Sequence, residues 1–178
     1  MQQALLFLAR ALCVFFSTLF LLRLLMQWRR ISFASPAGGF VLKLTNWAVL
    51  PMRRVIPGFW LDWASLIAAF VPHLFYALAF LFLSGLSAVL VTELDWALQL
   101  GIIALSSFLH TLIYLFIVLL LLRVILSWVN PYSPLAYPLA ILTAPLLAPV
   151  QRFIPPISGI DLSPLVVILI LQTLLFLV

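Results

Sequence analysis

Charged side chains are scarce in this sequence. The 178 residues include nine Lys and Arg and four Asp and Glu, so that 7% are charged and 67% are hydrophobic. A soluble domain carries about 25% charged residues, and the polar surface here is too small to cover a water-soluble globule. The composition, with a mean hydropathy of +1.33, therefore excludes a soluble protein and indicates an integral membrane protein.

Cysteine and carboxylates are also rare. Cys13 is the single cysteine, which excludes an internal disulfide and argues against a thiolate metal site. The four carboxylates lie at the ends of predicted helices or in a turn, and no nucleophile–base pair, P-loop or dinucleotide fingerprint occurs. We therefore expect no catalytic residue, no metal site and no enzymatic activity. The N-terminus lacks the basic region of a cleaved signal peptide, so we expect the first hydrophobic segment to be retained.

The sequence repeats a set of polar and aromatic residues about 100 positions later. Residues of these types are costly to place in an apolar chain, so the matches indicate an internal duplication rather than chance. We divide the chain into a first repeat at 1–91 and a second at 92–178. The matched positions are Arg23 with Arg123, Trp28 with Trp128, Thr45 with Thr143, Arg54 with Arg152, and Asp62 with Asp161.

Four hydrophobic segments are candidates to cross the membrane. A helix needs about 20 residues to span the hydrocarbon core, and the segments at 4–28, 62–90 and 97–128 meet this requirement. The fourth, at 163–178, is marginal and spans only if the bilayer thins or its flanking residues lie at membrane depth. We predict an all-α membrane protein with four transmembrane helices, arranged as two hairpins that are parallel repeats.

The distribution of charge predicts the orientation. Arg29, Arg30, Lys43, Arg53 and Arg54 lie in the first long loop and Arg152 in the second, whereas Glu93 and Asp95 lie in the short central turn. Excess Lys and Arg mark the cytoplasmic side of a membrane protein. We therefore expect both long loops in the cytoplasm and both termini outside, in the inner membrane of a bacterium.

Each long loop contains a further helical segment. Ser35-Pro36 and Ser133-Pro134 both resemble an N-cap followed by proline in the first helical turn. The segment from Ser35 to Pro51 has its apolar residues at helical spacing, which predicts an amphipathic helix in the membrane interface. Its counterpart, residues 135–150, is almost wholly apolar and contains Pro138 and Pro145. We expect these prolines to break it, so that it forms a re-entrant element or packs under the bundle.

The matched polar residues are the candidate sites. An arginine five residues inside an interfacial tryptophan needs a partner or must snorkel, and each aspartate begins the second helix of its repeat. We expect two structural ion pairs that join the arginines to the aspartates; the alternative is snorkelling arginines and helix-capping aspartates without contact. The residues in question are Arg23, Asp62, Arg123 and Asp161.

A second set of candidates lies at the predicted membrane surface. Arginines bracketed by prolines there favour binding of lipid headgroups or an acidic partner; the alternative is ordinary topology-determining charge. The lipid- or partner-binding candidates are Arg53, Arg54, Arg152, Trp28, Trp128, Thr45 and Thr143.

Two histidines could bind a cofactor. His73 and His110 lie about a dozen residues inside their predicted helices, and two facing imidazoles can ligate a b-type haem. They are not equivalent positions of the two repeats, however, and no third ligand is available for a closed zinc site. We therefore expect no cofactor, with packing or hydrogen-bonding roles for both side chains and haem as the alternative.

The second repeat resembles the YggT (YlmG) family. The residues that carry the resemblance are Arg123-Val124-Ile125-Leu126-Ser127-Trp128-Val129-Asn130-Pro131, residues 142–149, Arg152-Phe153-Ile154-Pro155 and residues 159–164. The first repeat has the same frame in weaker form. Gln151 stands where the family has the first of two basic residues, while Arg53-Arg54 keeps both.

The resemblance implies a small inner-membrane protein. Bacterial relatives are associated with cell division, envelope maintenance and osmotic stress, and chloroplast relatives with haem attachment and nucleoid distribution. We expect a scaffold or assembly factor that binds lipids and another membrane protein or a second copy of itself, with no direct binding of nucleic acid. The alternatives are a small channel or transporter for ion homeostasis and a haem-handling subunit.

Overall fold

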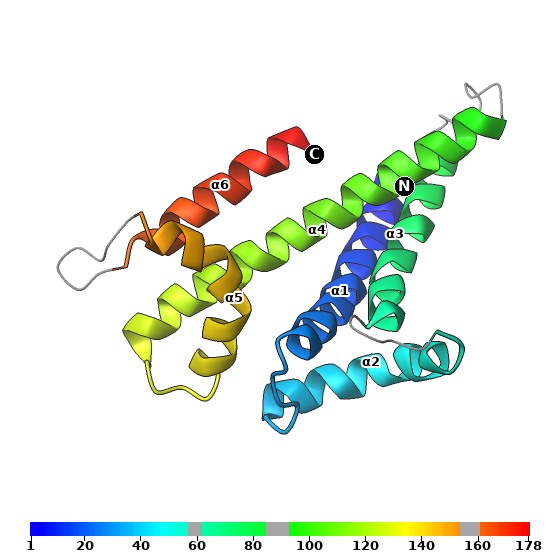
Figure 1. Cartoon of the computed structure of the whole chain (residues 1–178). Coiled ribbons are helices and arrows are strands. Elements are labelled where there is room, and N and C mark those ends of the chain that lie inside the picture. The colour runs from blue at the N-terminus through cyan, green and yellow to red at the C-terminus, as the bar shows by residue number, and fades with distance from the viewer. Residues whose placement is uncertain (57–61, 85–92, 154–160) are drawn as a thin grey trace.

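The computed structural model describes residues 1–56, 62–84, 93–153 and 161–178, and these form an all-α protein (Figure 1). No strand occurs in these ranges. The helices within them are α1 (Gln2–Trp28), α2 (Pro36–Val55), α3 (Trp63–Leu83), α4 (Glu93–Val129), α5 (Ala136–Gln151) and α6 (Ser163–Leu177).

Three of the helices are long and apolar enough to cross a membrane. These are Gln2–Trp28, Trp63–Leu83 and Asp95–Val129, which match the first three predicted segments and confirm a membrane-type fold. The predicted fourth span corresponds to α6, whose 15 residues fall short of the roughly 20 that a span requires. The four-span arrangement therefore stays a prediction. The predicted end of the second segment, at residues 85–90, lies outside the described residues.

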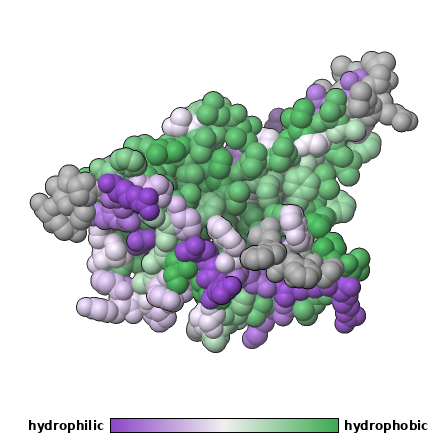
Figure 2. Space-filling view, in the orientation of Figure 1, coloured by the Kyte–Doolittle hydropathy of each residue, from purple (hydrophilic) through white to green (hydrophobic). Residues whose placement is uncertain are grey.

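α4 is the helix against which α1, α3, α5 and α6 pack. α1 packs along α3, both contact α4, and α5 and α6 pack against the other half of α4. Both chain ends lie on the upper side of the molecule in Figure 1, with the start of α4, while α2 and the connection between α4 and α5 lie on the lower side. The hydrophobic surface fills the middle of the molecule, and hydrophilic groups follow the lower edge along α2 (Figure 2).

Small residues on α3 allow the close packing of α1, α3 and α4. Ala64, Ala68, Ala69 and Ala77 of α3 are almost fully buried. Alanine at a helix interface lets two backbones approach, which is the main source of helix association inside a lipid bilayer. Large side chains of α1 and α4 fill the remaining space: Phe20, Leu21, Leu24, Leu25, Leu115 and Leu119.

α2 forms as the sequence predicts, with one correction at its end. Ser35 is the N-cap, and its side chain accepts a hydrogen bond from the backbone N–H of Gly38 at 3.2 Å. Val41, Thr45 and Val49 form its buried face. The helix continues past Pro51 to Val55, so the predicted end at Pro51 is wrong. Pro51 is on the exposed side of the helix, where water can satisfy the carbonyl that the missing N–H leaves unbonded.

α5 differs from the prediction in two respects. It is one continuous helix with Pro145 and Pro149 inside it, so the expected break is wrong. Pro138 lies in the first turn, where a backbone N–H has no helical acceptor in any case. Ser133 is not the N-cap, because the helix begins at Ala136, and the Ser133 hydroxyl instead accepts from the Leu135 N–H within the preceding turn. α5 rises from the lower side beside α4 instead of lying across the helix ends as α2 does (Figure 1).

Gly38 and Gly39, which are adjacent in α2, provide a matched test of the close packing at the start of this helix. A Cβ on Gly38 would lie 2.7 Å from the Cα of Phe33, whereas a Cβ on Gly39 would meet nothing within 4 Å. We expect Gly38→Ala to lower the free energy of unfolding by about 1–3 kcal/mol through overpacking against backbone. Gly39→Ala should leave it unchanged or raise it by up to about 1 kcal/mol through helix propensity. Unfolding in detergent micelles measures both, and equal effects would contradict this close approach.

Candidate functional site

The guanidinium of Arg23 joins α1 to α2. Arg23 is 2% exposed, and its Nη1 donates to Thr45 Oγ1 at 2.8 Å and to Asn46 Oδ1 at 2.9 Å. The Thr45 hydroxyl donates its own proton to the carbonyl of Val41 at 2.6 Å. This hydroxyl therefore accepts from the arginine and donates to the helix backbone at the same time. We call this contact the first Arg–Thr pair.

The second repeat contains an equivalent contact between α4 and α5. Arg123 Nη1 donates to Thr143 Oγ1 at 2.8 Å, and Thr143 Oγ1 donates to the carbonyl of Leu139 at 2.7 Å. Thr143 is fully buried, whereas Arg123 is partly exposed. We call this contact the second Arg–Thr pair. In both repeats a long apolar helix is thus tied to the following loop helix by the same two residue types.

The predicted ion pairs between these arginines and the aspartates are wrong. Neither Arg23 nor Arg123 forms an ion pair with Asp62 or Asp161, which both belong to the described part of the chain. The loop helices place threonine hydroxyls beside the arginines. The aspartates precede α3 and α6 and are bonded by other side chains, described next.

Asp62 is paired with Arg53. Arg53 Nη2 lies 2.7 Å from Asp62 Oδ2 and Nε lies 3.2 Å from Oδ1, which makes a bidentate ion pair. Arg53 also donates to Gln27 Oε1 at 2.7 Å, and Ser65 donates to Asp62. Burial alone would raise the pKa of Asp62, but the bonds from Arg53 and Ser65 outweigh it and lower the pKa below its ordinary value. The network joins the ends of α1, α2 and α3.

The matching position in the second repeat has no ion pair. Gln151 takes the place of Arg53, and its Nε2 donates to Asp161 Oδ2 at 2.8 Å. The backbone N–H of Ser163 donates to Asp161 Oδ1 at 2.9 Å. Burial acts to raise the pKa of Asp161, and the bonds from Ser163 and Gln151 lower it overall. Asp161 is therefore held by neutral donors and is exposed to solvent.

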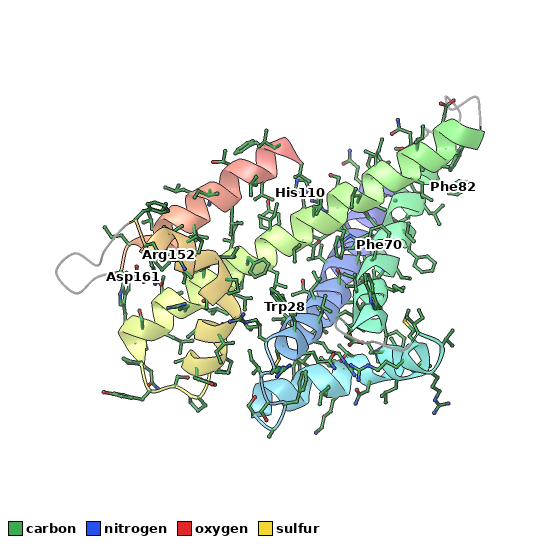
Figure 3. All side chains as sticks on the ribbon, in the orientation of Figure 1. Trp28, Phe70, Phe82, His110, Arg152 and Asp161 are labelled. Carbon is green, nitrogen blue, oxygen red and sulfur yellow. The ribbon has the colours of Figure 1, made fainter. Side chains whose placement is uncertain are left out.

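The other predicted surface residues divide into two groups. Trp28 and Trp128 are exposed, as are Arg54 and Arg152, so these four remain candidates to contact lipid or a partner. Arg152 and Asp161 are labelled near the connection between α5 and α6 in Figure 3. Thr45 and Thr143 are fully buried and cannot contact a partner. Arg53 is bonded to Asp62 and Gln27 and so has a structural role, and its predicted role in binding stays a prediction.

A polar network lies at the crossing of α1, α3 and α4. The sequence predicts a packing or hydrogen-bonding role for His73 but not the partners that it has in this network. His73 is fully buried; its Nε2 lies 3.0 Å from Ser17 Oγ and its Nδ1 lies 2.9 Å from Ser107 Oγ. Ser17 donates its proton to the carbonyl of Ala69 at 2.9 Å. It therefore accepts from His73, which assigns the ring proton to Nε2. Single serines such as Ser17 and Ser107 are common in apolar helices, so nothing in the sequence marks them as partners of His73.

The histidines do not fit a haem. Both ring nitrogens of His73 have serine partners, and its ring packs edge-on against Phe108 at 5.6 Å between centroids. His110, labelled on α4 in Figure 3, has its Nδ1 at 2.9 Å from the Ser106 carbonyl. A bis-histidine haem needs one free nitrogen on each ring facing a common flat space. His73 is fully buried and both of its ring nitrogens are hydrogen-bonded, so it has no free nitrogen and no open space beside it.

Two mainly apolar cavities lie beside His110. One, of about 240 Å³, is lined by Arg10, Tyr76, Ser107 and His110 among others. Another, of about 430 Å³, is lined by His110, Tyr114 and Gln172. A wet path through Arg10, His73 and His110 would favour a channel. Ser107, which lines the first cavity, is hydrogen-bonded to the His73 ring, but His73 itself lines neither cavity, so the channel alternative stays a prediction.

A comparison with protein-family models places the chain. The model described as CCB3/YggT matches residues 2–92 and 102–178. The chain belongs to the CCB3/YggT family. The two matched stretches nearly coincide with the predicted repeats at 1–91 and 92–178, and each stretch contains one Arg–Thr pair.

Curated relatives agree with the family assignment. The protein YggT of Escherichia coli strain K12 is 35% identical over 173 residues, which cover 96% of this chain and 86% of the relative. An uncharacterised protein of Pseudomonas aeruginosa is 33% identical over 157 residues, or 85% of this chain and 76% of that protein. The protein ycf19 of Guillardia theta is 40% identical over 70 residues, which are 38% of this chain and 76% of the relative. No solved structure matches.

The Arg–Thr pairs predict unequal effects of removing each hydroxyl. Thr45→Val keeps the shape but leaves the buried Arg23 guanidinium without one acceptor, which should lower the free energy of unfolding by about 1–3 kcal/mol. Thr143→Val should cost less, because Arg123 is partly exposed. Thr45→Ser retains the hydroxyl and serves as the control. Unfolding in detergent micelles measures all three, and a neutral Thr45→Val would contradict the contact.

The Asp62 network predicts a dependence of stability on pH. The pKa of Asp62 is lowered in the folded protein, so its contribution is full above the ordinary carboxyl range near pH 4. It is lost as pH falls through the lowered pKa. The wild type should therefore lose more stability on acidification than Asp62→Asn. Asp161→Asn should reduce the loss of stability on acidification by less than Asp62→Asn does, because Asp161 is exposed. Thermal unfolding from about pH 7 to pH 2 tests the order, and identical curves would refute it.

Proposed function

We propose that this protein is a non-enzymatic scaffold or assembly factor of the bacterial inner membrane. In this proposal α1, α3, α4 and α6 span the bilayer as two parallel-repeat hairpins, and α2 and α5 lie on the cytoplasmic side. The cytoplasmic face binds a protein partner or lipid headgroups. The repeated Arg–Thr pair is the observation that carries the proposal.

The Arg–Thr pairs support a rigid cytoplasmic face. A loop helix that only had to connect two spans would need no buried charged contact to hold it. Here α2 is held by Arg23 at its centre and by the Arg53–Asp62 ion pair at its end, and α5 is held by Arg123. Both loop helices are thereby fixed relative to the apolar helices, which is the condition for presenting a defined binding surface.

The exposed arginines of the two repeats also support a partner-binding face. Arg54 and Arg152 occupy matching places in the two repeats, and both are exposed. Arg53, next to Arg54, is held by Asp62 and Gln27, so the two arginines of the first repeat have different roles. An exposed guanidinium on a fixed element suits binding of an acidic partner through its planar donors.

The proposal predicts a partner that depends on both exposed arginines. The protein is purified from its native host in nanodiscs, and co-purifying proteins are identified by mass spectrometry. Arg54→Ala and Arg152→Ala should each reduce a stoichiometric partner by about fivefold or more, as expected for loss of a charge-assisted contact of at least ~1 kcal/mol. Arg10→Gln, at the other end of α1, is the control and should change nothing. Absence of a partner from the wild type would contradict the scaffold role.

A further inference from the structure

An apolar groove of about 570 Å³ opens on the outside of α1 and α3, above α2. Its walls include Phe16 and Phe20 of α1 and Val71 and Phe75 of α3, and Trp47 of α2 closes its lower end. The Trp47 ring packs against Phe16 and Phe20 with centroids 6.2 and 6.5 Å apart. The groove is thus a hollow in the hydrophobic surface that ends at the loop helix carrying most of the positive charge of the first loop.

The exposed side of α2 carries both apolar and basic residues. Phe40, Lys43, Trp47, Leu50 and Arg54 are all exposed, and their spacing of three and four residues places them on one helix face. Trp47 belongs both to this face and to the groove. Lys43 and Arg54 lie on either side of Trp47 along the helix, and neither has a partner among the described residues.

We propose that the groove and this face of α2 bind one anionic phospholipid. An acyl chain lies in the groove, and the Trp47 ring lies at the boundary between chain and headgroup. Lys43, about one turn before Trp47, and Arg54, about two turns after it, attract the anionic headgroup from either side. This inference rests on the proposed position of α2 in the cytoplasmic interface. Tryptophan favours that depth, and each basic side chain near the surface attracts an anionic headgroup.

The site is fixed before a lipid arrives. α2 cannot slide along the groove, because Thr45 is bonded to Arg23 and Arg53 to Asp62. A preformed pocket avoids the cost of ordering the protein on binding. Bulk lipid would fill any surface hollow, but the fixed position of two cations beside the groove selects lipids of negative charge.

The second repeat lacks this site. The positions that match Lys43 and Trp47 are Ile141 and Pro145, and only Arg152 corresponds to Arg54. α5 therefore has no tryptophan with a cation on each side of it. The two repeats share the Arg–Thr pair but differ in what the loop helix presents, and the chain supplies its own control for the experiment.

Retention of a defined lipid tests the proposal. Delipidated protein in micelles is mixed with phosphatidylglycerol or phosphatidylcholine of the same acyl chains, and bound lipids are counted by native mass spectrometry. The wild type should retain one phosphatidylglycerol with about tenfold or greater preference, as expected for two surface cations. Lys43→Gln with Arg54→Gln should abolish the preference, and Arg152→Gln should leave it unchanged.

A second variant tests the groove separately. Val71→Phe fills part of the groove without changing charge, and it should reduce retention of both lipids. An equal affinity of the wild type for the two lipids, or a loss with Arg152→Gln as large as with the Lys43 and Arg54 double variant, would overturn the proposal. A photo-crosslink from position 75 to a protein in place of a lipid would also overturn it.

The outcome is distinguishable from failure of the proposed function. Loss of the partner in Arg152→Ala tests the scaffold role without touching the groove, and Val71→Phe tests the groove without touching the exposed arginines. A wild type that retains its partner but shows no lipid preference contradicts only the lipid site. A wild type with the lipid preference and no partner supports the lipid site and contradicts the scaffold.

Discussion

The contact between a buried arginine and a threonine hydroxyl determines how the loop helices sit against the apolar bundle. A guanidinium inside an apolar helix is costly unless its donors are satisfied. Arg23 finds its acceptors on α2 and Arg123 on α5, so each loop helix must lie where its threonine meets the arginine. The depth of the arginine in the long helix therefore sets the position of the loop helix, and with it the Arg53–Asp62 ion pair and the groove above Trp47.

The two repeats share this contact and differ around it. The first repeat has a charged network at Asp62, an amphipathic loop helix and an apolar groove; the second has Gln151 at Asp161 and an apolar, proline-containing loop helix packed along α4 and α6. The structural contact is thus present in both predicted repeats, whereas the charged network and the groove belong to the first.

The sequence predicts the parts of the structure that depend on local pattern. Three apolar segments and the N-cap at Ser35 follow from length, hydropathy and spacing. The partner of Arg23 does not, because the repeat marks Thr45 and Asp62 equally and only the packing of α2 decides between them. The continuity of α5 through Pro145 also depends on packing against α4 and α6, and the bonds of His73 depend on serines from two other helices. These are tertiary properties that no window of sequence records.

A double-mutant cycle on Arg23 and Thr45 measures whether this contact positions α2. Free energies of unfolding in micelles are compared for the wild type, Arg23→Met, Thr45→Val and the double variant. We expect Thr45→Val to cost about 1–3 kcal/mol when Arg23 is present and close to nothing when it is absent, because the hydroxyl then has no cation to satisfy. Additive effects would show that the two residues do not depend on each other and would contradict the claim that this contact positions α2.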